Sequence, residues 1–350
     1  MQLRTSLRAG ISAFALTAAT AGLIASAMPA QANLAFANPM PTHVFAPYFE
    51  AYNGDDPATL SQESGAKYLV FAFIETAAAG SCTAYWNGST SQPLAYSTFG
   101  QEISQIQARG GQAVPSFGGY TADTTNTDIA DSCTDVNSIA AVYEGLITTY
   151  HITRIDLDIE ADSLTNTAGI HRRDEAVAET EAWAWRHGKS IQFSYTMPST
   201  TTGLSAPGVA VLQDAQSVGA KVSVVNAMTF DYYLGTTEEM ATDTETAGQG
   251  VFEQLKALHP HESAQQLWGQ IGITEMPGID DFGAPETFTT ADAQTVLHWA
   301  QQKGISTLSF WALQRDNGGC VGTKGAGTCS GVAQPDWYFS HTFERFTSWF

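Results

Sequence analysis

The sequence predicts a single (β/α)8 barrel, and three observations lead to this fold class. From residue 44 onward, eight short β-type segments alternate strictly with eight helical segments. Several of the β-type segments are continuous apolar runs, as expected of parallel strands that are covered by helices. No internal repeat, low-complexity linker or leftover span suggests a second domain. Strict alternation over one domain is the pattern of a barrel of parallel strands surrounded by helices.

The predicted strands are short apolar runs, rich in β-branched and aromatic residues. They cover Val44–Phe49, Tyr68–Glu75, Gln112–Phe117, Ile152–Ile159, Ser190–Tyr195, Val222–Phe230, Gln266–Ile271 and Ser306–Trp311. A doubly wound open sheet is the alternative, but it normally carries a glycine-rich nucleotide loop after its first strand. Residues 50–55 contain no GxGxxG motif, which favours the barrel.

The predicted helices fill the spaces between these strands. They cover Ala58–Ala66, Thr98–Arg109, Val136–Tyr150, Asp174–His187, Gly208–Val218, Gly248–Leu258, Thr290–Lys303 and Asp336–Trp349. Gly110, Gly188 and Gly304 directly follow three of them, as glycine often does where a helix ends.

Composition excludes several classes of partner. The chain has 350 residues, 43% of them hydrophobic and 14% charged, and its formal net charge is −20. A chain this apolar forms a packed core rather than a disordered segment. Nucleic-acid binding needs a basic face, and anionic membrane surfaces attract cationic proteins, so neither partner is expected. A neutral substrate fits better, and we expect a monomer.

The first 32 residues resemble a secretory signal peptide. Arg4 and Arg8 precede an apolar run from residue 11 to residue 27, and Ala30-Gln31-Ala32 gives a small-x-small cleavage site. We therefore expect cleavage after Ala32, a mature domain over residues 33–350, and a secreted, extracellular protein. The alternative is an uncleaved membrane anchor.

Export makes disulfides permissible, and the chain has four cysteines. Of the three possible connectivities we expect Cys82–Cys133 and Cys320–Cys329, because each pair would join loops on one face of the barrel. The absence of a CxxC spacing argues against zinc, and no neighbouring residue activates a catalytic thiol.

Three acidic residues alternate along the fourth predicted strand. Asp156, Asp158 and Glu160 point to one face, while the intervening Ile155, Leu157 and Ile159 point to the other. Isoleucine and leucine belong under helices, so the acids face the barrel interior, at the strand end where barrels carry active sites.

Burying three carboxylates together is costly unless they share protons or bind a cation. Mutual repulsion raises at least one pKa, which keeps that group protonated as a general acid. A Mg²⁺ or Ca²⁺ site is the alternative, but no complementary acidic cluster is evident at the other predicted strand ends. We therefore expect catalysis, with no metal and no cofactor.

Three motifs resemble those of glycoside hydrolase family 18, which includes chitinases and endo-β-N-acetylglucosaminidases. Asp156-x-Asp158-x-Glu160 resembles the DxxDxDxE signature, residues 116–119 (SFGG) resemble SxGG, and residues 228–231 (MTFD) resemble MxYD. Trp311 matches the tryptophan that forms the floor of the central sugar subsite. The resemblance covers residues 43–340, and the sequence is most similar to single-domain bacterial chitinases, which are TIM barrels.

The resemblance implies a retaining reaction in which the substrate's own 2-acetamido oxygen attacks the anomeric carbon. Glu160 would protonate the leaving oxygen and then activate water. Asp158 would bind the acetamido N–H and stabilise the oxazolinium charge, and Asp156 would share a proton with Asp158. Asp231 and Met228 would contact the sugar at this subsite.

Two positions depart from the family's motifs. Thr153 replaces the first aspartate of the signature, and Phe230 replaces the tyrosine whose hydroxyl donates to the acetamido oxygen. Tyr48, Tyr232 or Tyr233 are the candidates to supply that hydroxyl instead.

Other residues carry weaker predictions. Trp311 suits stacking on a sugar, with a core position as the alternative. Gln270 is a candidate sugar ligand or a satisfied amide, and Trp86 a candidate outer platform or an exposed loop aromatic. Ser116 and its two glycines are expected to act mainly as scaffold, and residues 259–262 to form a surface loop away from the acids.

The sequence therefore predicts a secreted chitinase acting on chitin or N-acetylglucosamine oligosaccharides. An endo-β-N-acetylglucosaminidase of the same family is the first alternative. A non-catalytic chitin-binding lectin is the second, and Phe230 is the feature that favours it.

Overall fold

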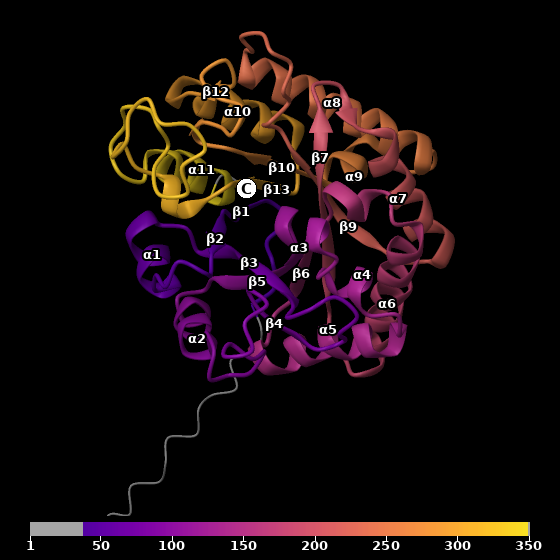
Figure 1. The fold of residues 1–350 in the computed structure, drawn as a ribbon. Coiled ribbons are helices and arrows are strands. Elements are labelled where there is room, and N and C mark those ends of the chain that lie inside the picture. The colour runs from indigo at the N-terminus through magenta and orange to yellow at the C-terminus, as the bar shows by residue number, and fades with distance from the viewer. Residues whose placement is uncertain (1–37, 349–350) are drawn as a thin grey trace, which may run out of the picture. The chain divides into compact units, whose positions relative to one another are not determined.

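Parallel strands form a closed wall in the computed structural model, which describes residues 38–348. Figure 1 shows the strands in the middle of the view with the main helices around them. The wall strands are β1 (Val44–Phe45), β2 (Tyr48–Glu50), β3 (Tyr68–Thr76), β5 (Gln112–Gly118), β6 (Arg154–Asp158), β7 (Gln192–Thr200), β9 (Val222–Met228), β10 (Ile271–Glu275) and β13 (Thr307–Phe310). The predicted (β/α)8 barrel is confirmed.

The first predicted strand closes the barrel in two pieces. The strand order is β1-β13-β10-β9-β7-β6-β5-β3-β2, so the two ends of the sheet are β1 and β2, which only Ala46 and Pro47 separate. Ala46 N–H donates to Leu308 O (3.0 Å), and Val70 N–H donates to Pro47 O (2.9 Å), so one segment pairs with both neighbours. Proline has no N–H to donate, which accounts for the interruption.

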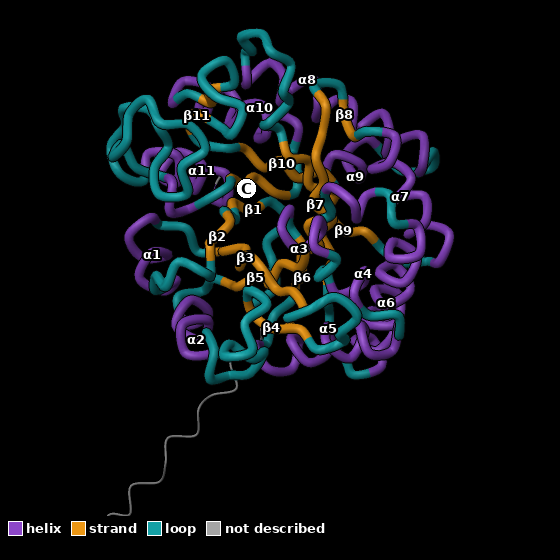
Figure 2. Tube along the Cα trace, in the orientation of Figure 1, coloured by secondary structure: helices purple, strands orange, loops and turns teal. Residues whose placement is uncertain are grey.

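The helices cover the outside of the wall (Figure 2). The main ones are α1 (Pro57–Ser64), α2 (Gly100–Ala108), α5 (Val136–Tyr150), α6 (Thr167–Arg186), α7 (Ala206–Val218), α8 (Met240–Leu258), α10 (Thr290–Lys303) and α11 (Tyr338–Ser348). Three shorter helices are α3 (Tyr120–Thr125), α4 (Ile129–Ser132) and α9 (Ala264–Trp268), and 3₁₀ turns cover Ala161–Leu164 and Leu313–Arg315.

Short strands extend the loops at the C-terminal ends of the barrel strands. They are β4 (Ala84–Trp86) beside β3, β8 (Gly203–Leu204) beside β7, and the pair β11 (Gly278–Ile279) and β12 (Thr287–Phe288).

Alternation along the first segment separates two hydrophobic cores. Phe45 and Phe49 belong to the large core between strands and helices, whereas Val44, Ala46 and Tyr48 belong to a smaller core inside the barrel. Both sets are almost fully buried. Because neighbouring residues face opposite sides of a strand, the same short segment contributes to both cores.

The seventh predicted strand is the main error in the sequence-based elements. Residues 264–268 form helix α9, which begins with a capping box between Ser263 and Gln266, and the strand β10 starts only at Ile271. The cap satisfies backbone N–H groups that a strand would leave unpaired here. Helices α6 and α8 also begin earlier than predicted, α6 with Asn166 accepting from Gly169 N–H.

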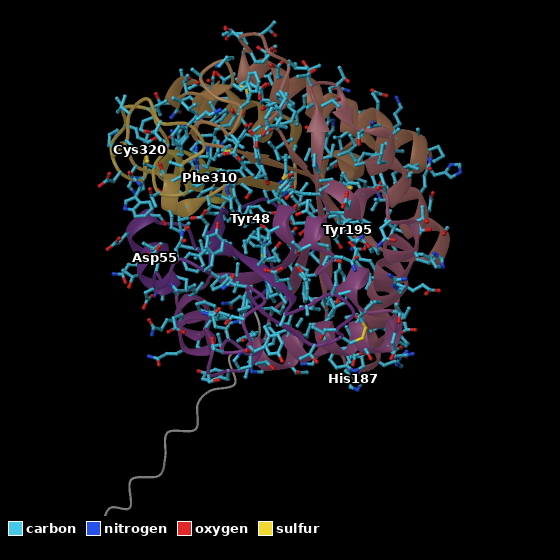
Figure 3. All side chains as sticks on the ribbon, viewed as in Figure 1. Tyr48, Asp55, His187, Tyr195, Phe310 and Cys320 are labelled. Carbon is cyan, nitrogen blue, oxygen red and sulfur yellow. A yellow bond between two sulfur atoms is a disulfide. The ribbon has the colours of Figure 1, made fainter. Side chains whose placement is uncertain are left out.

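Both predicted disulfides are confirmed. Cys82 bonds to Cys133, and Cys320 bonds to Cys329. The first joins the β3–β4 loop to the end of α4, and the second closes the loop after β13; Figure 3 labels Cys320 in this loop. Within residues 38–348 no helix combines the length and apolar character needed to cross a bilayer. The predicted signal peptide, residues 1–32, lies outside the described residues.

Candidate active site

Three carboxyl groups stand in a row at the C-terminal end of β6, as predicted. Asp156 and Asp158 lie on the strand and are 2% and 4% exposed, and Glu160 follows two residues later. The intervening Ile155 and Leu157 pack in the large outer core. The alternation therefore turns the acids to the barrel interior.

Asp156, the deepest of the three, is saturated by hydroxyl groups. Its Oδ2 accepts from Ser116 (2.7 Å) and Tyr48 (2.9 Å), and its Oδ1 accepts from Ser194 (2.5 Å) and Thr196 (2.8 Å). Burial raises the pKa of Asp156, and the four hydroxyl groups partly oppose that rise. In Figure 3 Tyr48 lies near the centre of the barrel.

Asp158 is the middle carboxyl group, and it has an oxygen without a hydrogen-bond partner among the described residues. That oxygen is Oδ1, on a side chain that lines the main cavity. Burial raises the pKa of Asp158 strongly, and Glu160 and Asp156 add to the rise through charge repulsion. Asp158 therefore has capacity to accept a hydrogen bond from a ligand.

Glu160 also lines the cavity. Burial raises its pKa to about 7, which the backbone N–H of Tyr120 opposes by donating to the carboxylate. Its own backbone N–H donates to Asp123 Oδ2 at 2.5 Å. A carboxyl group with this pKa exists in both protonation states near neutral pH, as a general acid/base requires.

The cavity in front of these acids has a volume of about 960 Å³, which is the size of a small-molecule or oligosaccharide site. The described residues that line it combine aromatic rings with carboxyl groups and include no lysine, arginine or histidine. The aromatic lining residues are Tyr48, Tyr52, Phe73, Tyr120, Phe230, Tyr233 and Trp311. Trp311 stacks on Phe73 with ring centroids 5.5 Å apart, so two strand ends form a flat apolar floor.

Four of the predicted substrate-binding residues line the cavity. Tyr48 lies on β2, Met228 and Asp231 lie at and just after the end of β9, and Trp311 directly follows β13. Burial raises the pKa of Asp231 to about 7, and the neighbouring carboxyl groups of Asp280 and Asp281 add to the rise.

Gln270 is not part of this cavity, which corrects its predicted position. It precedes β10 instead of lying on it, and its side-chain amide donates to Glu262 Oε2 and Gln266 O. Because β10 begins after Gln270, the side chain lies at the N-terminal end of the barrel. It is a satisfied amide next to the loop of residues 259–262.

Two aromatic predictions are corrected in the same way. Tyr232 packs against the outer core, and of the two tyrosines after Asp231 it is Tyr233 that lines the cavity. Trp86 is fully buried on β4, where its Nε1–H donates to Tyr150 Oη (3.1 Å), so it is a core residue rather than an outer platform.

The glycines of the SFGG segment allow close backbone approach. Gly118 has φ +88°, and a Cβ there would lie 2.2 Å from Asp158 O. Gly119 has φ +83°, and its N–H donates to the same oxygen at 3.0 Å. Only glycine fits such a position, so this segment is scaffold next to the acids, as predicted, while Ser116 contacts Asp156 directly.

Sequence reasoning missed several lining residues. Phe73 and Glu75 lie at the end of β3, and Tyr52, Tyr120 and Asp281 lie on loops or at a helix start. The alternation of β3 toward its C-terminal end could have indicated Phe73 and Glu75. The loop residues carry no periodic signal.

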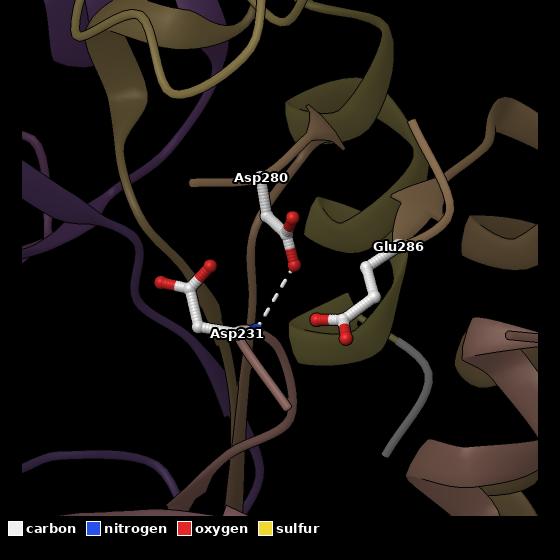
Figure 4. Close-up of side chains that lie close together, drawn as sticks. All are labelled: Asp231, Asp280 and Glu286. Carbon is white, nitrogen blue, oxygen red and sulfur yellow. Dashed lines mark hydrogen bonds between the residues drawn. The ribbon is translucent and has the colours of Figure 1, made fainter. Parts of the chain in front are cut away.

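A second acidic cluster lies beyond β9, where Figure 4 shows Asp231, Asp280 and Glu286 together. Asp280 accepts from the backbone N–H groups of Asp231 (3.0 Å) and Gly283 (3.1 Å). Glu286 accepts from those of Tyr232 (2.7 Å) and Leu234 (3.1 Å). Both oxygens of each group are thus used to fix loop backbone.

Comparisons with known proteins identify the family of the chain. Glycosyl hydrolases family 18 matches residues 44–267. The probable bifunctional chitinase/lysozyme of Escherichia coli (strain K12) is 29% identical over 320 residues, which are 88% of this chain and 35% of that protein. Endochitinase 11 of Metarhizium anisopliae is 30% identical over 288 residues, 79% of this chain and 53% of that protein. The chain thus spans between about a third and about half of the length of these curated relatives.

Solved structures of a chitinase from Pyrococcus furiosus are also similar. Its catalytic domain has a TM-score of 0.76 and 31% identity, covering 89% of this chain and 97% of that one. The structure of catalytic site mutants of its active domain 2, complexed with chito-oligosaccharides, has a TM-score of 0.78 and 30% sequence identity, and covers 89% of this chain and 97% of that one. Fold, carboxyl row and comparisons together define a glycoside hydrolase. The chain belongs to glycoside hydrolase family 18.

Proposed function

We propose that this protein hydrolyses the β-1,4 bonds of chitin and N-acetylglucosamine oligosaccharides by a retaining, substrate-assisted mechanism. The observation that carries the proposal is Oδ1 of Asp158, beside Glu160 in the cavity, which has no hydrogen-bond partner within residues 38–348. A buried acceptor without a donor costs free energy unless a ligand supplies one. The 2-acetamido N–H of the substrate is a donor of the right kind.

The first step is proton donation by Glu160. The protonated carboxyl group gives its proton to the glycosidic oxygen, and the bond from that oxygen to the anomeric carbon breaks. The 2-acetamido oxygen attacks the anomeric carbon and forms an oxazolinium ion. The carboxylate of Asp158 accepts the acetamido N–H and stabilises the positive charge.

The second step returns the proton. Glu160, now ionised, removes a proton from water, whose oxygen attacks the anomeric carbon and opens the oxazolinium ring. Two displacements at one carbon leave the product in the β configuration of the substrate. Asp156 keeps its four hydroxyl donors throughout. Its negative charge raises the pKa of Asp158, so the two carboxyl groups titrate together.

Aromatic residues hold the sugar during these steps. Trp311, stacked on Phe73, offers a flat apolar surface to the face of a pyranose ring. Phe230 lines the cavity but has no hydroxyl to donate to the acetamido oxygen. Tyr48 donates its single hydroxyl proton to Asp156 (2.9 Å), so we propose that Tyr233, which lines the same cavity, takes that role.

Export and a monomeric state are parts of the same proposal. The features of residues 1–32 support a cleaved signal peptide, and an extracellular enzyme meets a polymer that cannot enter a cell. The two disulfides are consistent with an oxidising compartment.

Product analysis on chitohexaose tests the proposed function. Mass spectrometry and ¹H NMR of fresh products would compare the wild-type protein with Glu160→Gln. We expect shorter oligomers with β-anomeric reducing ends from the wild type and intact hexamer from the variant. Intact hexamer with both proteins would contradict a chitinase; saturable binding would then indicate a lectin. Cleavage of an N-glycan instead would indicate an endo-β-N-acetylglucosaminidase.

A further inference from the structure

We propose that Asp123 is a positioning residue that holds Glu160 ready for proton transfer, from a helix outside the strand motif. This inference rests on the proposed role of Glu160 as general acid/base. Asp123 lies on α3, is 1% exposed, and accepts the Glu160 backbone N–H on Oδ2 at 2.5 Å. It does not line the cavity.

The backbone of Glu160 is not fixed by strand pairing, because β6 ends before this residue. Strand β6 stops at Asp158, and the N–H of Ile159 still pairs with Thr196 O (2.8 Å) on β7. The next N–H, that of Glu160, donates to Asp123 instead of to a neighbouring strand, and a 3₁₀ turn begins at Ala161. A backbone N–H this close to the core requires an acceptor. The Asp123 carboxylate therefore takes the place of a strand carbonyl and fixes the backbone one residue beyond the last strand hydrogen bond.

Helix α3 approaches Glu160 at two points. Asp123 accepts from the Glu160 backbone N–H, and the backbone N–H of Tyr120, at the start of the same helix, opposes the rise in the pKa of the Glu160 carboxyl group. Gly118 permits this approach, since a Cβ there would lie 3.3 Å from Asp123 Oδ1 and 2.2 Å from Asp158 O. The position of the carboxyl group is therefore tied to α3 as well as to β6.

Buried charges surround Asp123 on its other side. Arg173 of α6 is 1% exposed and pairs with Asp128 Oδ1 at 3.1 Å, and Asp128 directly precedes α4. The charged groups that face Asp123 are Asp128, Arg173, Glu160 and Asp158. Asp123 Oδ1 has no hydrogen-bond partner among the described residues, so its connection to Arg173 and Asp128 is electrostatic.

Asp131 provides a matched control in the same network. It also faces Arg173 and Asp128, but it accepts from Ser163 and Asn166 instead of from Glu160. Replacing it by asparagine disturbs buried charge without touching the backbone of Glu160.

The test compares Asp123→Ala, Asp123→Asn and Asp131→Asn with the wild type. On chitohexaose, Asp123→Ala is expected to lower kcat about 10²-fold with little change in KM, because a displaced acid slows chemistry without removing substrate contacts. Asp123→Asn keeps an acceptor oxygen and should restore kcat to within about tenfold of the wild type. Asp131→Asn should keep kcat within about threefold.

A second readout needs no substrate. The Glu160 amide proton, assigned with ¹⁵N-glutamate labelling and Glu160→Gln, should resonate downfield in the wild type because of its short bond to a carboxyl group. Asp123→Ala should move it upfield, and Asp131→Asn should leave it in place. An unmoved resonance in Asp123→Ala would overturn the inference.

The kinetic outcomes separate this inference from the proposed function. A wild type that leaves chitohexaose intact contradicts the proposed function, while the amide resonance still tests the contact. An active wild type with equal kcat losses in Asp123→Ala and Asp131→Asn, in proportion to lowered Tm, would show a merely structural role for Asp123. Wild-type kcat in Asp123→Ala would also overturn the inference.

Discussion

The two acidic clusters of this barrel are built from the same residue types but treat their oxygens differently. In the β6 cluster, Asp156, Asp158 and Glu160, the deepest carboxylate accepts from four hydroxyl groups. Asp158, by contrast, has an oxygen with no hydrogen-bond partner in the described part of the chain. In the second cluster, Asp280 and Glu286 give every oxygen to loop backbone N–H groups.

Hydrogen bonding of the carboxylate oxygens, and not burial, distinguishes the carboxyl groups of the two clusters. Asp158 and Asp280 are 4% and 1% exposed, so burial does not distinguish them. A carboxylate whose oxygens are fully used stabilises the fold. One with an unpaired oxygen facing a cavity can bind or react. Four perturbations test whether this difference separates catalytic from structural carboxyl groups.

The largest effect is expected from Glu160→Gln. Glutamine keeps the size of the side chain but cannot give or take the proton, so kcat should fall about 10²–10⁴-fold. Steady-state kinetics on chitohexaose would measure it, with a thermal melt as the check on folding. A loss smaller than tenfold would remove Glu160 from its assigned role.

The pH dependence of kcat should report the ionisation of Glu160. Because burial raises the pKa of Glu160 to about 7, the protonated acid is abundant below that pH. Activity should therefore fall about tenfold per pH unit above about pH 7. A profile of kcat from pH 4 to 9 would measure the limb. An alkaline limb near pH 4–5, the range of an ordinary glutamate, would contradict the assigned environment.

Glu286→Gln should act on stability rather than on chemistry. Glutamine retains one acceptor oxygen for the two N–H groups of Tyr232 and Leu234 and adds a buried donor, at a cost of about 1–3 kcal/mol. We expect Tm to fall by several degrees and kcat to stay within about threefold. A kcat loss like that of Glu160→Gln would make the second cluster catalytic as well.

The smallest effect concerns Glu275 on β10, which is fully buried and has one oxygen without a hydrogen-bond partner among residues 38–348. Burial raises its pKa to about 8. Since this pKa lies above the unfolded value, the stabilising contribution is present below about pH 4.3 and is lost as pH rises through about 8. Glu275→Gln should thus raise Tm by a few degrees at pH 8.5 relative to its effect at pH 5. The exposed Glu253→Gln is the control, and equal shifts at both pH values would contradict the prediction.

The sequence predicted the fold well because its signals are periodic. Apolar runs that alternate with helical patterns predicted eight strands and eight helices. The period-2 pattern of residues 155–160 predicted that the acidic side chains point to the barrel interior. The same rule failed at residues 266–270, where a five-residue helix with a capping box lies next to an apolar strand. Gln270 was misplaced as a consequence.

The positions of the other site residues could not be predicted, because they depend on the backbone conformation of loops. Tyr233 rather than Tyr232 faces the cavity after Asp231 takes a positive φ of 51°, a backbone choice that no residue pattern reveals. Asp123 contacts Glu160 across 37 residues of sequence. Trp86 looked like an exposed loop aromatic, but the short strand β4 buries it completely.

The comparison is tested most directly by the matched pair Asp158→Asn and Asp280→Asn, measured side by side for kcat and Tm. We expect a kcat loss of about 10²–10³-fold for Asp158→Asn with little loss of Tm, because the lost charge acts on the reacting sugar. Asp280→Asn should lower Tm by several degrees and leave kcat within about threefold. Equal losses of kcat in the two variants, or a lowered Tm without a kcat effect in Asp158→Asn, would contradict it.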